Sequence, residues 1–212
     1  MGDKTFKNQK NIEDALKLLK IVVRILDNHN IKYYLDFGTL IGAMRDNAFI
    51  PWDDDIDISL VNEEDYKKIP EILEEIKKEY GYRTYLHTFK QSIDKFFKKE
   101  KINVKPNINF TDEENYQIAK IRNNKFWRFG RGNTCIDIFF KYKYEKNIYW
   151  FAYGKVHKIS LNDYNDEIMQ IDFYGISCKV LTGYDKYLHS IYGDWKTPNE
   201  IWSQNTGNLS IQ

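Results

Sequence analysis

The stretch IPWDDDIDISL, residues 50–60, places four aspartates within five positions and sets them between apolar runs. These acids are Asp53, Asp54, Asp55 and Asp57. From Asp55 onward, acidic and aliphatic residues alternate, which predicts a strand over residues 55–61 with alternate side chains on one face. Asp55 and Asp57 would then lie on the same side, roughly 6–7 Å apart along the strand. The isoleucines between them would enter the core.

Parallel carboxylates on a half-buried strand repel each other and lose hydration, and a bound cation would offset that cost. Carboxylate oxygens at this spacing suit Mg²⁺ or Mn²⁺. A second predicted strand, residues 134–142, sets Asp137 between two isoleucines and supplies a third acid. We therefore predict Asp55, Asp57 and Asp137 as metal ligands and catalytic residues.

A calcium-binding EF-hand loop is the alternative interpretation of the same acids. Asp53, Asp55, Asp57 and Ser59 alternate, and Glu64 occupies the twelfth position, which matches the ligand spacing of that loop. The sixth position is Ile58, however, where the sharp turn of the loop requires glycine. The EF-hand interpretation is therefore rejected.

Gly38-Thr39 follows a strand predicted over residues 31–37 and opens a short helix. The backbone N–H groups at a helix N-terminus bind phosphate. Gly38 lets the backbone approach a ligand, and Thr39 adds a hydroxyl donor. The three acids, which we expect on adjacent strands, and this turn together form the working parts of a nucleotidyltransferase-type site.

The remaining periodicity predicts an α+β fold in a single domain over residues 1–212, with a variable excursion near 88–115. Helices are predicted over 11–29, with Asn11 as the N-terminal cap, over 63–80, ending before Gly81, and over 184–192. Further strands are predicted at 82–88, 116–122, 148–158 and 171–180.

Composition narrows the class of protein. The 212 residues carry a net charge of +1, which gives no global field for nucleic acid, so no nucleic-acid partner is expected. Two cysteines do not form a disulfide framework and indicate reduced thiols. Because no 18-residue apolar run and no signal peptide occur, we expect a cytoplasmic location.

GTLIGAMR at residues 38–45 and FIPWDDDID at 49–57 closely resemble the signature of the LicD family, which includes bacterial phosphocholine transferases and is related to fukutin and fukutin-related protein. Three further parts of the sequence are similar to that family: residues 33–36 to the strand before its Gly-Thr pair, residues 120–122 with 136–139 to its middle block, and residues 187–198 to its C-terminal segment. Residues 46–48 and Trp195 depart from the family pattern, and these departures leave the donor and acceptor open.

The resemblance implies a nucleotidyltransferase-like fold with a mixed sheet flanked by helices. It also implies transfer of a phospho-substituent, such as phosphocholine or an alditol phosphate, from a CDP-linked donor to a sugar hydroxyl, with release of CMP. The acceptor would be a cell-surface glycan or glycolipid, as in capsule or lipopolysaccharide modification. Such an acceptor can bring the protein to a membrane surface.

On this hypothesis Mg²⁺ on the Asp-x-Asp strand neutralises the diphosphate, and Asp137 either ligates a second ion or takes the hydroxyl proton. Arg45, Lys120 and Arg122 are candidate phosphate-binding residues. For Arg45 a favourable position at a helix C-terminus is the alternative.

Three further acids have two interpretations each. Asp53 and Asp54 either cap the turn or orient metal-bound water and the acceptor. Asp36 is either a substrate contact or a buried, hydrogen-bonded acid. Two other functions also stay open: a nucleotidyltransferase that attaches a nucleotide and releases pyrophosphate, and a non-catalytic nucleotide-binding module.

Overall fold

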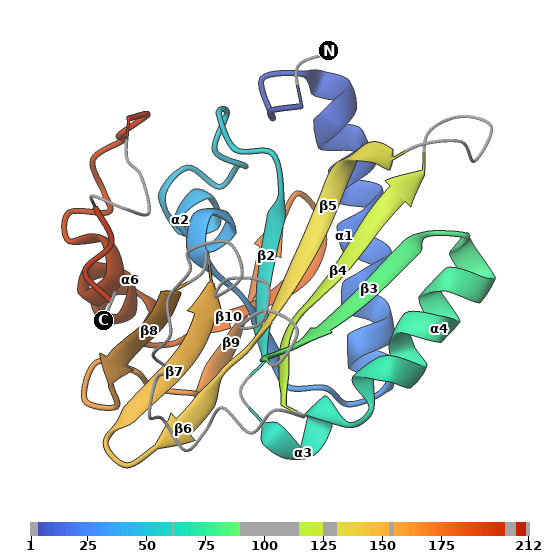
Figure 1. Cartoon of the computed structure of the whole chain (residues 1–212). Coiled ribbons are helices and arrows are strands. Elements are labelled where there is room, and N and C mark those ends of the chain that lie inside the picture. Colours follow the sequence, from blue (N-terminus) through green and yellow to red (C-terminus); the bar gives the residue numbers. More distant parts are fainter. Residues whose placement is uncertain are drawn as a thin grey trace, which may run out of the picture.

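The computed structural model describes residues 4–60, 62–89, 115–124, 131–152, 155–201 and 207–210. It has mixed α and β content, and helices flank a five-stranded mixed sheet, as predicted (Figure 1). The predicted excursion near 88–115 falls almost entirely outside the described residues.

The strands of the main sheet run in the order β1 (Tyr33–Leu35), β2 (Ile56–Leu60), β5 (Arg131–Phe140), β4 (Tyr116–Asn124) and β3 (Arg83–Thr88). β2 and β5 are parallel, and the other neighbours are antiparallel. In both parallel strands isoleucines enter the core, and Asp57 lies directly opposite Asp137. The prediction that these two acids lie on adjacent strands is confirmed.

Two helices, α1 (Gln9–Asn28) and α4 (Ile69–Tyr80), lie together against one face of this sheet (Figure 1). The cap of α1 differs from the prediction. Asn8 caps the helix by accepting the N–H two residues further on, at 3.0 Å. Asn11 is instead buried inside the first turn. The apolar stripe predicts that a helix is present, but it does not show whether Asn8 or Asn11 is the N-terminal cap.

The single helix predicted over residues 63–80 is divided into α3 (Glu63–Tyr66) and α4. Pro70 explains the break, because proline has no N–H for a helix interior and is tolerated only in the first turn. The helix therefore restarts just before it. Gly81 ends α4 in the left-handed conformation, with φ of 69°, as predicted.

The rest of the chain surrounds the sheet. Helix α2 (Phe37–Arg45) follows β1, and α6 (Tyr184–Tyr192) spans the residues predicted for it. The later strands are β6 (Tyr142–Tyr144), β7 (Asn147–Ala152), β8 (Lys155–Ser160), β9 (Ile168–Phe173) and β10 (Ile176–Leu181). The first three form an antiparallel sheet, whereas the last two form a hairpin in contact with β1.

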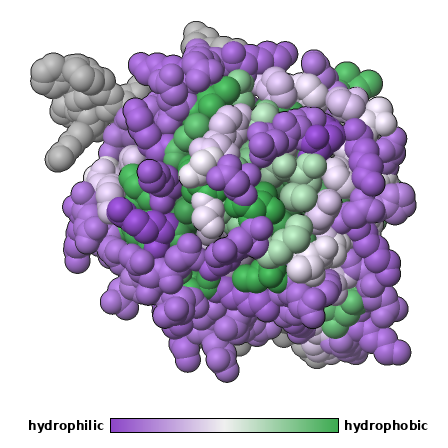
Figure 2. All heavy atoms as spheres, turned by 180° about the vertical axis from the view of Figure 1, so that it is seen from behind, coloured by the Kyte–Doolittle hydropathy of each residue, from purple (hydrophilic) through white to green (hydrophobic). Residues whose placement is uncertain are grey.

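Figure 2 shows the reverse face, on which hydrophilic residues surround a central area of hydrophobic ones. Among the helices in the described part of the chain, none is long and apolar enough to cross a membrane.

Candidate metal and substrate site

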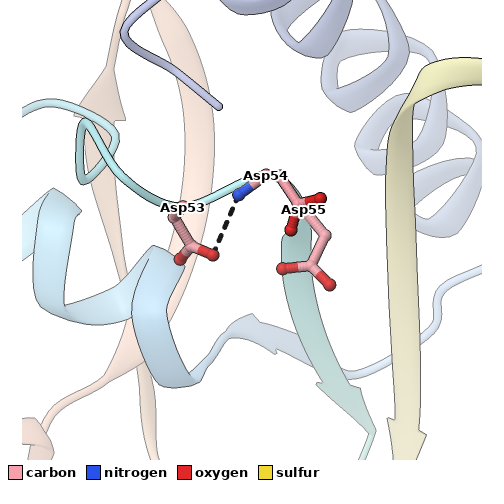
Figure 3. Close-up of side chains that lie close together, drawn as sticks. All are labelled: Asp53, Asp54 and Asp55. Atoms are coloured by element: carbon pink, nitrogen blue, oxygen red, sulfur yellow. Dashed lines mark hydrogen bonds between the residues drawn. The ribbon is translucent and has the colours of Figure 1, made fainter. Parts of the chain in front are cut away.

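Three acids meet where the chain enters β2. Asp53, Asp54 and Asp55 immediately precede the first strand residue, Ile56, and one carboxylate oxygen of each lies within 4.8 Å of the others (Figure 3). The Asp54 N–H donates to Asp53 Oδ1 at 3.0 Å, which fixes the turn between them. An oxygen-only set of donors is the chemistry that Mg²⁺ and Mn²⁺ prefer.

Asp57 and Asp137 lie deeper, at 8% and 6% exposure. Lys120 forms an ion pair with Asp137, and Cys135 Sγ donates to the same carboxylate at 3.1 Å. The tightest acidic group in the described residues is therefore 53–55, whereas the sequence predicted Asp55, Asp57 and Asp137. The difference arises because β2 begins at Ile56, so Asp55 sits in the preceding bend with its neighbours.

The assembled negative charge perturbs the carboxyl groups. Burial raises the pKa of Asp57 and of Asp55 well above the ordinary range, and the surrounding carboxylates raise both further. Burial also raises the pKa of Asp53, to about 6, partly opposed by the hydrogen bond from Asp54. A divalent cation would favour the ionised forms and offset this cost.

A pocket of about 410 Å³ lies above these acids. It is lined by the helix residues Phe37, Gly38, Ile41 and Arg45, by Ile50, Trp52, Asp53, Asp55 and Asp57, and by Tyr192, Asp194, Trp195, Thr197 and Asn199. The last group, called here the C-terminal wall, was visible in the sequence only as a family-like segment. Asp137 is absent from this lining.

The Gly38-Thr39 turn has two different functions in the structure. A Cβ atom at Gly38 would lie 2.3 Å from Asp53 Oδ2, so glycine is needed for this close approach. Thr39 is buried, and its Oγ1 accepts the Asp57 N–H at 2.9 Å. The Thr39 hydroxyl thus supports the backbone of β2, and Thr39 does not line the pocket; its role as a phosphate donor stays a prediction.

Asp36 is fully buried, which favours the second of its two interpretations, a buried and hydrogen-bonded acid. One carboxylate oxygen accepts the Phe37 N–H and the Tyr187 hydroxyl, each at 2.7 Å. The other pairs with Lys141 Nζ at 2.7 Å and accepts the Ser59 hydroxyl. A charge this deep requires such partners.

Lys141 is a residue that the sequence did not single out. It follows the apolar run that ends β5, where a lysine ordinarily marks the return to solvent, yet it is 0% exposed. Burial lowers its pKa, and the Asp36 carboxylate opposes that shift. The sequence pattern of β5 alone could not predict that Lys141 would pair with Asp36, which lies far away in the chain.

The three predicted phosphate-binding residues do not lie together in the structure. Arg45 lines the pocket, pairs with Asp46 at 2.7 Å and donates to the Trp195 carbonyl at 3.4 Å, so it joins α2 to the C-terminal wall. Lys120 is engaged with Asp137. Arg122 lies further along β4, opposite Cys135, and neither β4 residue lines the pocket.

Comparison with known proteins agrees with the sequence motif. Residues 30–105 match the model of the family described as LicD/FKTN/FKRP, nucleotidyltransferase domain. An uncharacterized protein of Rickettsia typhi is 32% identical over 128 residues, which are 54% of this chain and 41% of that protein. The lipopolysaccharide cholinephosphotransferase LicD of Haemophilus influenzae is 36% identical over 70 residues, which are 33% of this chain and 26% of the enzyme. The matches thus span less than half the length of these relatives, and they confirm the predicted family resemblance.

Proposed function

We propose that this chain is a LicD-type, metal-dependent phosphotransferase with a nucleotidyltransferase-like fold. It would move a phospho-substituent, such as phosphocholine or an alditol phosphate, from a CDP-linked donor to a sugar hydroxyl of a surface glycan or glycolipid. CMP would be the leaving product. The observation that carries the proposal is the pocket in which Asp53, Asp55 and Asp57 face the N-terminus of α2.

The residues present fit a hard divalent cation. Asp53, Asp54 and Asp55 would hold Mg²⁺ or Mn²⁺ through carboxylate oxygens. When bound, the ion neutralises charge on the donor diphosphate and on the departing CMP. Asp57 and Asp137, opposite each other, could hold a second ion or accept a proton.

The chain itself supplies binding and proton transfer. The Phe37 N–H bonds to Asp36, so the N-terminal turn of α2 would contact an anion through the N–H of Gly38, which lines the pocket. Arg45 adds a charge-assisted contact. As the acceptor oxygen bonds to phosphorus and the bond to CMP breaks, the hydroxyl proton passes to a carboxylate. Asp57 suits this role because it lines the pocket and burial raises its pKa.

This proposal includes a cytoplasmic location, no nucleic-acid partner and an acceptor that brings the protein to a membrane surface. The family match supports the reaction class, and the name of the Haemophilus relative supports cholinephosphate as one donor group to test.

The test is product analysis with purified protein, Mg²⁺, and a glycan acceptor. We expect CMP from CDP-choline or a CDP-alditol, and loss of at least about 100-fold in rate for Asp55→Asn and Asp57→Asn, in keeping with removal of a group that stabilises transition-state charge. Asp166→Asn, which removes a surface carboxylate paired with Lys143, is the matched control and should retain the rate.

Two results would contradict the proposal. Pyrophosphate released from CTP, without CMP from any CDP-linked compound, would indicate a nucleotidyltransferase. Nucleotide binding without turnover, unchanged in both variants, would indicate a binding module.

A further inference from the structure

We propose that Lys141 is a positioning residue for this site: it holds the N-terminus of α2 and the helix α6 so that the acidic floor and the C-terminal wall face one pocket. The inference rests on the proposed function. It concerns a residue that does not itself line the pocket.

The Lys141 side chain is fully buried among the described residues. It pairs with Asp36 at 2.7 Å and donates to the Tyr187 hydroxyl. The ring centroids of Trp150, Phe37 and Tyr187 lie 4.4, 4.7 and 4.7 Å away, within the range of cation–π attraction. One side chain therefore contacts residues from β1–α2, β7 and α6.

From Asp36 the connection continues to the acidic floor. The Asp36 N–H donates to the Asp57 carbonyl at 2.9 Å, and the Thr39 hydroxyl accepts the Asp57 N–H at 2.9 Å. Both backbone polar groups of Asp57 are thus held by the first residues of α2. A shift of Asp36 would move Asp57 with it.

Backbone strain at Phe37 is a second, independent observation. This residue has φ of 44°, in the left-handed region that a bulky side chain rarely adopts. Such conformations persist where surrounding contacts over-determine them, and they concentrate at functional sites. Here the Phe37 N–H bonds to Asp36 and its ring packs beside Lys141. The next residue, Gly38, faces the pocket.

The connection to the opposite wall runs through α6. Tyr187 bonds to Asp36 in the middle of this helix, and Tyr192 at its end begins the C-terminal wall. Lys141 therefore contacts both Asp36, which holds the acidic floor, and Tyr187, which belongs to the helix leading to the C-terminal wall. A buried ion pair is weak evidence for stability alone, because a neutral, well-packed replacement is often as stable. Stability and positioning can be separated experimentally.

The experiment neutralises the pair as a unit. Asp36→Asn combined with Lys141→Met removes both charges and keeps similar volumes. Its control neutralises the exposed pair Lys143–Asp166, 2.6 Å apart, through Lys143→Met with Asp166→Asn. Binding of Mn²⁺ is measured by electron paramagnetic resonance, and folding by circular dichroism and thermal unfolding.

We expect the buried double variant to unfold cooperatively but to bind Mn²⁺ about tenfold more weakly, the lower end of the loss caused by removing the partners of metal ligands. The control should bind like the wild type. A folded buried variant with wild-type affinity would overturn the inference.

If the buried double variant does not fold, Tyr187→Phe decides, since it deletes one hydroxyl and keeps the ring. It should weaken Mn²⁺ binding several-fold, and unchanged affinity would overturn the inference. Wild-type protein that binds no Mn²⁺ would instead overturn the proposed function and the inference together.

Discussion

The backbone at Gly38 lies directly beside the Asp53 carboxylate. A sequence pattern does not predict that the Asp53 side chain points this way. The motif indicated that Gly38 permits close approach, but the approaching group in the structure is one of the protein's own acids. Asp36 and Thr39 lie on either side of the left-handed Phe37, the first residue of α2. No periodicity in the sequence predicts such a φ angle for phenylalanine, so the sequence could not decide between the two interpretations of Asp36.

Gly38→Ala should therefore affect the site more than the fold. The added methyl group meets the end of a flexible side chain, which can move, and alanine favours the helix by up to about 1 kcal/mol. We expect little change in unfolding free energy but weaker Mg²⁺ binding and slower CMP release, measured by calorimetry and product assay. Gly183→Ala, with its nearest neighbour at 3.6 Å, is the control. A large stability loss with normal metal binding would contradict this account.

At the scale of elements, the strongest predictions came from alternation. The Ile-Asp-Ile patterns of β2 and β5 predicted both strands, and their parallel pairing placed Asp57 beside Asp137. Helix α6 was also predicted with the bounds that the structure has, Tyr184–Tyr192. The break before α4 was missed because residues 63–80 have one apolar stripe, whereas Pro70 acts on the backbone. The apolar stripe gives no indication that proline lacks the backbone N–H that a continuous helix needs.

Gly42→Ala tests the packing of α2 against the segment that leads to the acids. A Cβ atom there would lie 2.3 Å from the Ala48 carbonyl oxygen, which belongs to the backbone and cannot simply rotate away. We expect a loss of about 1–3 kcal/mol in unfolding free energy, the usual cost of overpacking. Urea denaturation measures it. The comparison with Gly38→Ala is informative because both substitutions lie in one helix, and equal stabilities would show that the clash is relieved at no cost.

At the scale of the whole molecule, the pocket joins segments that lie far apart in the chain. The acids and α2 lie between Phe37 and Asp57, so one motif could predict them, and this stretch lies within residues 30–105, which the family model matches. The C-terminal wall and Lys141 reach the site only through tertiary packing, by way of Tyr187 and Trp195. A pattern within one short segment of sequence cannot predict contacts between residues that lie so far apart in the chain.

The acidic floor should make stability depend on pH and on metal together. Without divalent cations, the pKa of Asp53 is raised from 3.8 to about 6, so the folded state binds this proton more tightly than the unfolded state. Its contribution is present below pH 3.8 and is lost as pH rises through about 6. The midpoint temperature of the wild type relative to Asp53→Asn should therefore fall over this interval, measured by thermal unfolding in EDTA.

Adding Mg²⁺ should reverse the difference above pH 6, because a ligand that binds only the folded state stabilises it by mass action, by about 2.7 kcal/mol at 100 times its dissociation constant. Near pH 4 protons compete for the same oxygens, so the Mg²⁺ effect should shrink. Asp53→Asn lacks one of the ligand carboxylates and should respond less at every pH. If wild type and variant show parallel pH profiles and equal responses to Mg²⁺, Asp53 does not belong to the metal site, and Asp55 would have to act with Asp57 and Asp137 instead.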